Sequence, residues 1–134
     1  MKMRAQLSVE MVVISAAMIG LLIAMFLVNE YLRSSWESQK QSFQAGAAAN
    51  RLAMAINQAS SSGNGATIAF FNRVGQDITN MSLYDGRSVR AFYLAGGYSS
   101  AAISTNNTNV SGSIPLNQLL LIRNVNGTIY VEAA

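Results

Sequence analysis

The sequence contains neither cysteine nor histidine. Without cysteine the chain has no disulfide framework and no thiolate metal site. Without histidine it lacks the commonest general base and the commonest metal ligand. The remaining acid–base groups, six acidic residues and two lysines, are scattered along the chain. These absences predict a protein that is not an enzyme, that has no catalytic residues, and that holds neither a metal ion nor a cofactor.

Charge is scarce as well. Charged residues make up 11% of the chain, against about 25% in an ordinary soluble domain. The net charge is only +3, and two of the cations, Lys2 and Arg4, lie near the first residue. The sequence has no basic stripe of the kind that nucleic-acid binding requires. We therefore expect no nucleic-acid partner.

The strongest positive signal is a run without any charge at residues 11–28. As a helix it would cover ~27 Å, close to the ~30 Å hydrocarbon thickness of a bilayer. A cleaved secretory signal has a shorter apolar stretch and then a small-residue site, which the following NEYLRSSWESQK does not offer. A buried helix of a soluble protein is the minor alternative. A retained transmembrane helix is favoured, with Lys2 and Arg4 on the inner side, a bias that Arg33 weakens but does not reverse.

The helix is expected to continue beyond the membrane, over residues 6–60. Residues 29–59 contain no proline, and the stretch QSFQAGAAANRLAMAINQA is rich in alanine and glutamine, which favour helices. The loop-forming SSSGNG at residues 60–65 ends the pattern. One face of this helix carries an apolar stripe, which we expect to cover the following domain: Leu32, Trp36, Phe43, Ala47 and Met54.

Residues 66–134 change to short stretches rich in β-branched and aromatic residues, the pattern of strands. Asp85-Gly86 and Asn126-Gly127 each separate two such stretches, which predicts two hairpins. The only proline, Pro115, places residues 113–115 at an edge or turn. GGYSS at residues 96–100 is interpreted as a turn. The expected fold class is α+β, a long N-terminal helix plus a small antiparallel β-sheet head domain of about five strands.

Four N-x-S/T sequences are candidate acceptors of N-linked glycans, at Asn80, Asn106, Asn109 and Asn126. Chance alone predicts roughly two in a chain of this composition, so the excess is small. Their placement is more informative, because none of the asparagines before residue 75 forms such a sequence. This placement fits a glycosylated extracellular head, although turn chemistry explains Asn126 equally well.

The N-terminal stretch RAQLSVE, residues 4–10, followed at once by the apolar run, resembles the class III signal peptide of archaeal type IV pilins. That motif consists of a basic residue, a small residue and then Q-x-S-x-E. The resemblance implies that a prepilin peptidase cuts between Ala5 and Gln6, so that residues 1–5 are a leader peptide and the apolar helix is kept. The family often has glycine where this chain has Ala5. Beyond residue 30 the resemblance is one of architecture only.

The resemblance also implies a function, that of a structural subunit of an extracellular type IV pilus filament used for adhesion or surface motility. Such a subunit is held in the cell membrane as a precursor. It then polymerises through its apolar helix into a homo-oligomeric filament on the cell surface. An assembly ATPase and a membrane platform protein are further implied partners. The alternative is a minor pilin, a pseudopilin or a membrane-anchored binding protein of a secretion or Tad-like system.

The same resemblance gives Glu10 a role. A carboxylate in lipid costs roughly 2.5–3.5 kcal/mol on insertion scales and is tolerated when it is paired. Cleavage would create an α-amine at Gln6, which Glu10 of a neighbouring subunit could neutralise; alternatively, Glu10 lies among lipid headgroups. Further subunit contacts are expected at Ala16, Gly20 and Ala24, whose spacing of four residues lets helix backbones approach closely.

Overall fold

The computed structural model describes residues 2–104 and 109–134, and the side chains of residues 9–104 and 109–134. Asn106, one of the four sequon asparagines, lies outside the described residues. The chain divides into two compact units, Met1–Glu37 and Ser38–Ala134. We call the first the N-terminal unit and the second the globular unit.

One α-helix, α1 (Lys2–Ser61), contributes to both units. It begins before residue 6, where the sequence predicted its start, and it ends one residue after the predicted end at residue 60. The loop chemistry expected at its end is present. The N–H of Ser62 donates to the carbonyl oxygen of Gln58 at 3.0 Å, and Gly63 adopts a φ of 86°. A glycine in this left-handed conformation is a common way to end a helix.

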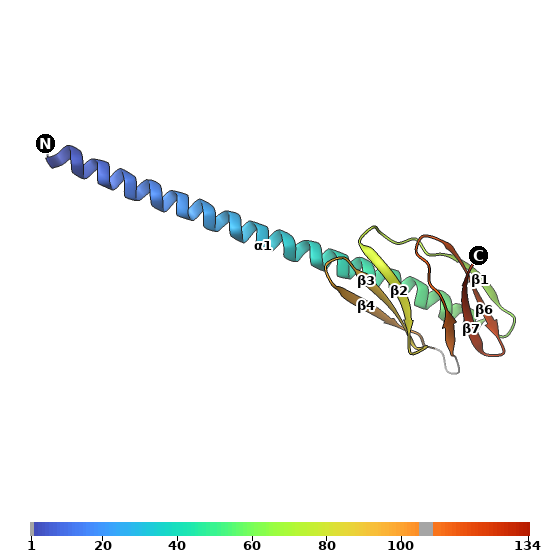
Figure 1. Cartoon of the computed structure of the whole chain (residues 1–134). Coiled ribbons are helices and arrows are strands. Elements are labelled where there is room, and N and C mark those ends of the chain that lie inside the picture. Colours follow the sequence, from blue (N-terminus) through green and yellow to red (C-terminus); the bar gives the residue numbers. More distant parts are fainter. Residues whose placement is uncertain (1, 105–108) are drawn as a thin grey trace. The chain divides into compact units, whose positions relative to one another are not determined.

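Seven β-strands follow in the described part of the globular unit (Figure 1). They are β1 (Thr67–Phe71), β2 (Ile78–Tyr84), β3 (Ser88–Tyr93), β4 (Gly97–Ala102), β5 (Val110–Gly112), β6 (Leu119–Val125) and β7 (Thr128–Ala133). One sheet has the strand order β1-β6-β7-β5, and the other has the order β2-β3-β4. Among the described strands, only the β5–β7 pair is parallel. The α+β class is confirmed, but two sheets replace the single sheet of about five strands.

Both predicted hairpins are present. Asn126 and Gly127 join β6 to β7 with φ angles of 50° and 82°. Asp85 and Gly86 join β2 to β3 with φ angles of 54° and 61°. A type I′ turn requires positive φ at both central residues, and Asn-Gly and Asp-Gly adopt this conformation at low steric cost. These turns are therefore determined by local residue chemistry.

The prediction of a turn at residues 96–100 is wrong for all but its first residue. Gly96 has a φ of 82°, and its N–H donates to the carbonyl oxygen of Tyr93 at 3.1 Å. Strand β4 begins at Gly97 and pairs with β3 along its whole length. A run of glycine and serine has little strand preference of its own, so the pairing with β3 decides its conformation.

Strand β5 was not expected from the sequence. It has three residues and pairs in parallel with β7. Gly112 is required there, because its φ is 134° and a Cβ atom would collide with the carbonyl oxygen of Val131. Residues 113–115 lie outside every described strand, in agreement with the prediction made from Pro115.

The core of the globular unit forms between the C-terminal part of α1 and the two sheets. The helix contributes an alanine-rich face: Ala45, Ala48, Ala49, Leu52, Ala53, Ala55, Ile56 and Ala59. The sheets contribute fully buried side chains such as Val89, Leu120, Ile122, Ile129 and Val131. Because alanine side chains are small, the helix backbone can approach the strands closely.

The expected apolar stripe does not form this contact, so that prediction is wrong. Trp36, Phe43 and Met54 are 70%, 80% and 70% exposed, and Leu32 and Ala47 are exposed as well. At 100° per residue the stripe lies on the side of the helix opposite the alanine-rich face. The alanine-rich face is the one that close packing against two sheets selects.

Hydrogen bonds between polar groups link α1 to the sheet β2-β3-β4 and its turns. The side-chain oxygen of Gln41 accepts a hydrogen bond from the N–H of Ala95 at 2.9 Å. The hydroxyl of Ser99 donates to the carbonyl oxygen of Ser42 at 2.9 Å. These bonds give partners to polar groups at the helix–sheet boundary.

Candidate functional site

The apolar segment, residues 11–28 of α1, has side chains that no other described part of the chain covers. An 18-residue window of the helix has a mean hydropathy of 2.8, and none of it is buried. Its large apolar side chains, from Met11 to Val28, are between 55% and 65% exposed. Burying one such side chain contributes about 1.5–3 kcal/mol. Lipid or another apolar surface that covered the segment would therefore stabilise it strongly.

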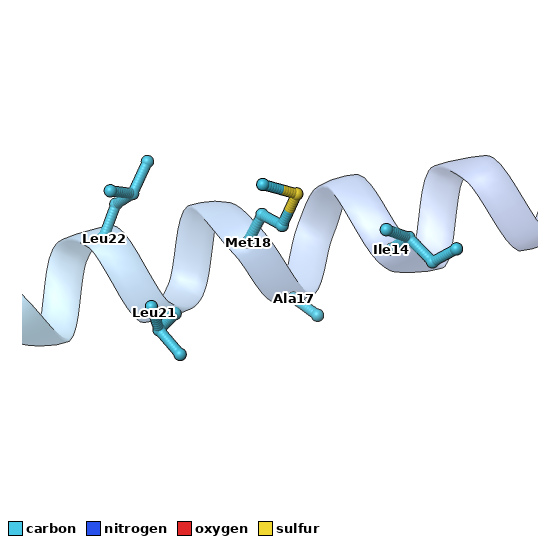
Figure 2. Close-up of a pocket in the computed structure, with 5 residues that line it drawn as sticks. All are labelled: Ile14, Ala17, Met18, Leu21 and Leu22. Carbon is cyan, nitrogen blue, oxygen red and sulfur yellow. The ribbon is translucent and has the colours of Figure 1, made fainter.

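Small residues leave shallow depressions on this surface. In the depression that Figure 2 shows, Ile14, Met18, Leu21 and Leu22 surround Ala17. Residues 14, 17, 18 and 21 follow the spacing i, i+3, i+4, i+7. In knobs-into-holes packing, four side chains with this spacing receive one side chain from a facing helix.

A second depression repeats the first one seven residues later. Leu21, Ala24, Met25 and Val28 line it, together with two residues nearer the C-terminus. Ala24 and Met25 thus take the places of Ala17 and Met18. A repeat of seven residues is the pattern that lets two helices pack at a shallow angle of about 20°.

A third depression lies on a different side of the helix, roughly 120–140° around the helix axis from the other two. It is lined by Met11, Val12, Ser15, Ala16 and Ile19. Its position follows from the 100° rotation per residue of an α-helix. The hydroxyl of Ser15 is satisfied within the helix, since it donates to the carbonyl oxygen of Met11 at 2.8 Å. This side of the segment therefore needs no polar partner at Ser15.

The predicted contact residues Ala16, Gly20 and Ala24 do not line one common depression. Ala16 and Ala24 belong to different depressions, and Gly20 belongs to neither of these two. An added Cβ atom at Gly20 would meet nothing within 4 Å. No packing contact within the described chain therefore requires glycine at this position.

Ala5, Gln6 and Glu10 all lie in α1. The side chains of Ala5 and Gln6 are outside the described ones, whereas Glu10 is exposed. Among the described side chains, the only ion pair joins Arg33 and Glu37, at 3.4 Å between two exposed groups. Glu10 has no cationic partner within this described set. The contact predicted for Glu10 is one between subunits, which a single chain does not test.

Three of the four sequon asparagines can be placed. Asn126 sits in the β6–β7 turn, where its side-chain oxygen accepts from Asn64 at 3.2 Å and its N–H donates to Asn64 at 2.8 Å. Asn109 is exposed immediately before β5. Asn80 is exposed on β2, and no hydrogen bond among the described residues involves its side chain. Turn formation thus accounts for Asn126, whereas no local structure accounts for Asn80.

The sequence did not single out the outer face of the sheet β2-β3-β4. This face combines Tyr84, Arg90, Phe92 and Tyr98. The guanidinium carbon of Arg90 lies 3.3 Å from the ring centroid of Tyr84 and 4.7 Å from that of Tyr98. Both distances fall within the range of cation–π contacts. No sequence signal identified this face, because it depends on the pairing of β3 with β2 and β4.

The described residues contain no group of three or more acidic residues placed to hold a metal ion. They form a groove lined by residues 80–83 and 112–115, with similar polar and apolar character. This groove contains no titratable side chain. The prediction that the chain is not an enzyme therefore rests on composition alone.

Comparison of the chain with protein-family models, with curated proteins and with solved structures found no match. Its architecture is a long helix with an apolar N-terminal segment and a β-rich domain packed against the C-terminal part of that helix. This architecture is consistent with a pilin-like fold. One helix among the described residues is long and apolar enough to cross a membrane, which suggests membrane association or secretion.

Proposed function

We propose that the chain is a structural subunit of an extracellular filament of the type IV pilus kind, used for adhesion or surface motility. The observation that carries this proposal is the apolar segment, whose large side chains are at least 55% exposed. An uncovered apolar surface of this extent marks an interaction site. Lipid would cover it before assembly, and the same segments of neighbouring subunits would cover it in the filament.

The depressions on the apolar segment support packing among helices. Lipid chains require no particular shape, whereas holes repeated at seven residues match the side chains of a helix. The hole at Ala17 and the hole at Ala16 lie on different sides of α1, roughly 120° apart around the helix axis. A helix surrounded by copies of itself has neighbours on several sides, so this arrangement favours a multi-helix core over a simple pair.

The proposed route to assembly begins with removal of the leader. A prepilin peptidase would cut between Ala5 and Gln6, and the new amine at Gln6 would pair with Glu10 of an adjacent subunit. A buried charge without a partner is strongly destabilising, so this pair would set the register between helices. An assembly ATPase and a membrane platform protein would supply the work of extraction from the membrane.

The experiment that tests this function is the recovery of filaments sheared from cells. Mass spectrometry of that material should find this chain as the main component, beginning at Gln6. Recovery of the chain only in the membrane fraction, with residues 1–5 still attached, would refute the proposal. The measurement must detect cyclised N-terminal glutamine, because cyclisation blocks chemical sequencing.

The alternative function is that of a minor subunit or a membrane-anchored binding protein of a secretion or Tad-like system. The specific observation in its favour is the partly exposed aromatic face, where Tyr84 and Tyr98 are 52% and 50% exposed. Aromatic side chains with a polar end are enriched at binding surfaces. Abundance separates the two functions, since a minor subunit would be rare in sheared filaments and an anchored protein would be absent.

A further inference from the structure

The outer face of the sheet β2-β3-β4 places a sequon asparagine in line with two aromatic residues. Asn80 on β2 lies directly opposite Phe92 on β3, and Phe92 lies directly opposite Tyr98 on β4. Side chains directly opposite each other in antiparallel strands have Cβ atoms about 4.5–5.5 Å apart. Asn80, Phe92 and Tyr98 thus form one row across three strands, which we call the aromatic row.

A β-bulge at Thr79 lets Ile78 reach the core while Asn80 stays in this row. Ile78 pairs with Tyr93 and Asn80 pairs with Phe92, so that Thr79 is an extra residue in β2. In a regular strand, residues 78 and 80 would point to the same face. Instead Ile78 is 5% exposed in the core, while Asn80 is exposed on the outer face. Bulges commonly redirect one side chain in this way.

The aromatic part of the row is held in place by its neighbours. The rings of Phe92 and Tyr98 are tilted by 49° with their centroids 5.7 Å apart. The guanidinium group of Arg90 lies over Tyr98 and Tyr84. The Nε atom of Arg90 is buried without a hydrogen-bond partner, which shows how closely the rings enclose it. Even so, half of the Tyr98 surface is exposed.

The surroundings of Asn80 leave room for an attached group. On the side away from Phe92, Asn80 and Ser82 line a groove of about 420 Å³ that continues along Gly112, Ser113 and Pro115. Ser82 is the third residue of the sequon and points to the same face as Asn80, because the two are separated by one residue in a strand. The sequon at Asn80 is therefore presented as a unit at the open edge of the sheet.

We propose that Asn80 carries an N-linked glycan whose sugars pack across Phe92 and Tyr98. Saccharides present faces of C–H groups, and such apolar patches match aromatic rings that are fixed and partly exposed. Adjacent strands are about 4.8 Å apart, so Tyr98 lies roughly 10 Å from Asn80 across the sheet. The first sugar would therefore cover Phe92, and the next would reach Tyr98.

The covalent step takes place outside the cytoplasm, so this inference rests on the proposed function. The co-reactant is an oligosaccharide joined through phosphate to a membrane lipid. A bond forms between the amide nitrogen of Asn80 and the anomeric carbon of the first sugar, while the bond from that carbon to the phosphate oxygen breaks. The amide nitrogen loses one proton, and the lipid phosphate leaves.

The first test is mass spectrometry of the full chain purified from its native host. The peptide that contains Asn80 should carry a glycan mass, and Asn80→Gln and Ser82→Ala should each remove it. Asn126→Gln is the matched control and should leave that mass in place. An unmodified Asn80 in assembled filaments would overturn the inference and leave the proposed function intact. A glycan at Asn80 on a chain that never forms filaments would support this inference and contradict the proposed function.

The second test measures packing between the sugar and the rings by thermal unfolding of the same chain in detergent. Phe92→Ala and Tyr98→Ala should lower Tm more when Asn80 is glycosylated than in an Asn80→Gln background. The expected difference is on the order of 4 °C or more for a unit of this size. Tyr84→Ala is the control, because Tyr84 contacts Arg90 but lies outside the aromatic row. Equal shifts in both backgrounds for Phe92 and Tyr98 would overturn the packing and assign the rings a purely structural role.

Discussion

The side-chain amide of Asn124 donates a hydrogen bond to the carbonyl oxygen of Ala59 across 3.3 Å, in the interior of the globular unit. The same amide lies 3.4 Å from the carbonyl oxygen of Ser60, and the side-chain oxygen accepts from the N–H of Gly127 at 3.2 Å. Asn124 on β6 therefore binds the last turn of α1 and the β6–β7 hairpin at once. The last carbonyl groups of a helix have no partner within the helix, and Asn124 supplies one.

Asn124→Ala should destabilise the globular unit by about 1–3 kcal/mol. The substitution leaves helix carbonyl groups without a donor at a position that water does not reach, since Asn124 is 4% exposed. Thermal unfolding of the full chain in detergent, followed by circular dichroism, measures the change. Asn50→Ala is the control on the exposed surface of α1 and should change stability by less than about 0.5 kcal/mol. Similar Tm values for the two variants would contradict a structural role for Asn124.

The orientation of α1 against the sheets can be tested at two nearby apolar positions. Leu52 is fully buried, whereas Met54 is 70% exposed. Leu52→Ala should cost about 2–5 kcal/mol, because it removes core contacts and leaves a cavity. Met54→Ala should have little effect on the unfolding of the globular unit. Chemical denaturation measures the free energy of unfolding of both variants. A larger loss of stability for Met54→Ala than for Leu52→Ala would indicate that the predicted apolar stripe contacts the sheets.

Glu10→Ala should abolish or strongly reduce filament assembly while leaving expression and cleavage unchanged. The proposed reason is the loss of the partner for the amine at Gln6 of a neighbouring subunit. Electron microscopy of sheared material counts the filaments, and intact mass reports the cleavage. Glu30→Ala, at an acidic residue beyond the apolar segment, is the control and should assemble normally. Filaments of normal number and length from Glu10→Ala would exclude the pairing, as would cyclised Gln6 throughout wild-type filaments.

Gly20→Leu should weaken the filament without affecting the globular unit. Nothing in the described chain lies within 4 Å of a Cβ atom at Gly20, so the isolated subunit accommodates a side chain there. A neighbouring helix that approaches closely at this position would collide with the leucine side chain. Dissociation of filaments by heat or detergent gives the measurement, with Ile19→Leu as a control of equal volume. Filaments of Gly20→Leu that resist dissociation as well as wild type would count against a close helix contact at Gly20.

Local residue chemistry made part of the fold predictable. The Asn126-Gly127 and Asp85-Gly86 turns need positive φ, which few other residue pairs accept, and both turns are present. The stretch SSSGNG at residues 60–65 ends α1, because serine, asparagine and glycine favour conformations other than the helix. The exposure of the apolar segment was also predictable, since the sequence has no second apolar stretch long enough to cover it.

Other features depend on contacts between residues far apart in the chain. Strand β4 consists of glycine, serine, alanine and tyrosine, and only its pairing with β3 defines it. The bulge at Thr79 arises because Ile78 and Met81 must both reach the core. The aromatic row could not be predicted from the sequence, because it depends on the register that pairs Asn80 with Phe92 and Phe92 with Tyr98.

The sequence by itself determined an apolar segment that needs cover, a helix that continues beyond it, and a β-rich region with two defined turns. These follow from hydropathy and from the backbone preferences of single residues, which act locally. The tertiary structure alone decided which face of α1 meets the sheets and which asparagine stands beside aromatic rings. Those outcomes follow from close packing, because alanine at positions 45, 48 and 49 admits the strands where the larger Phe43 and Met54 do not.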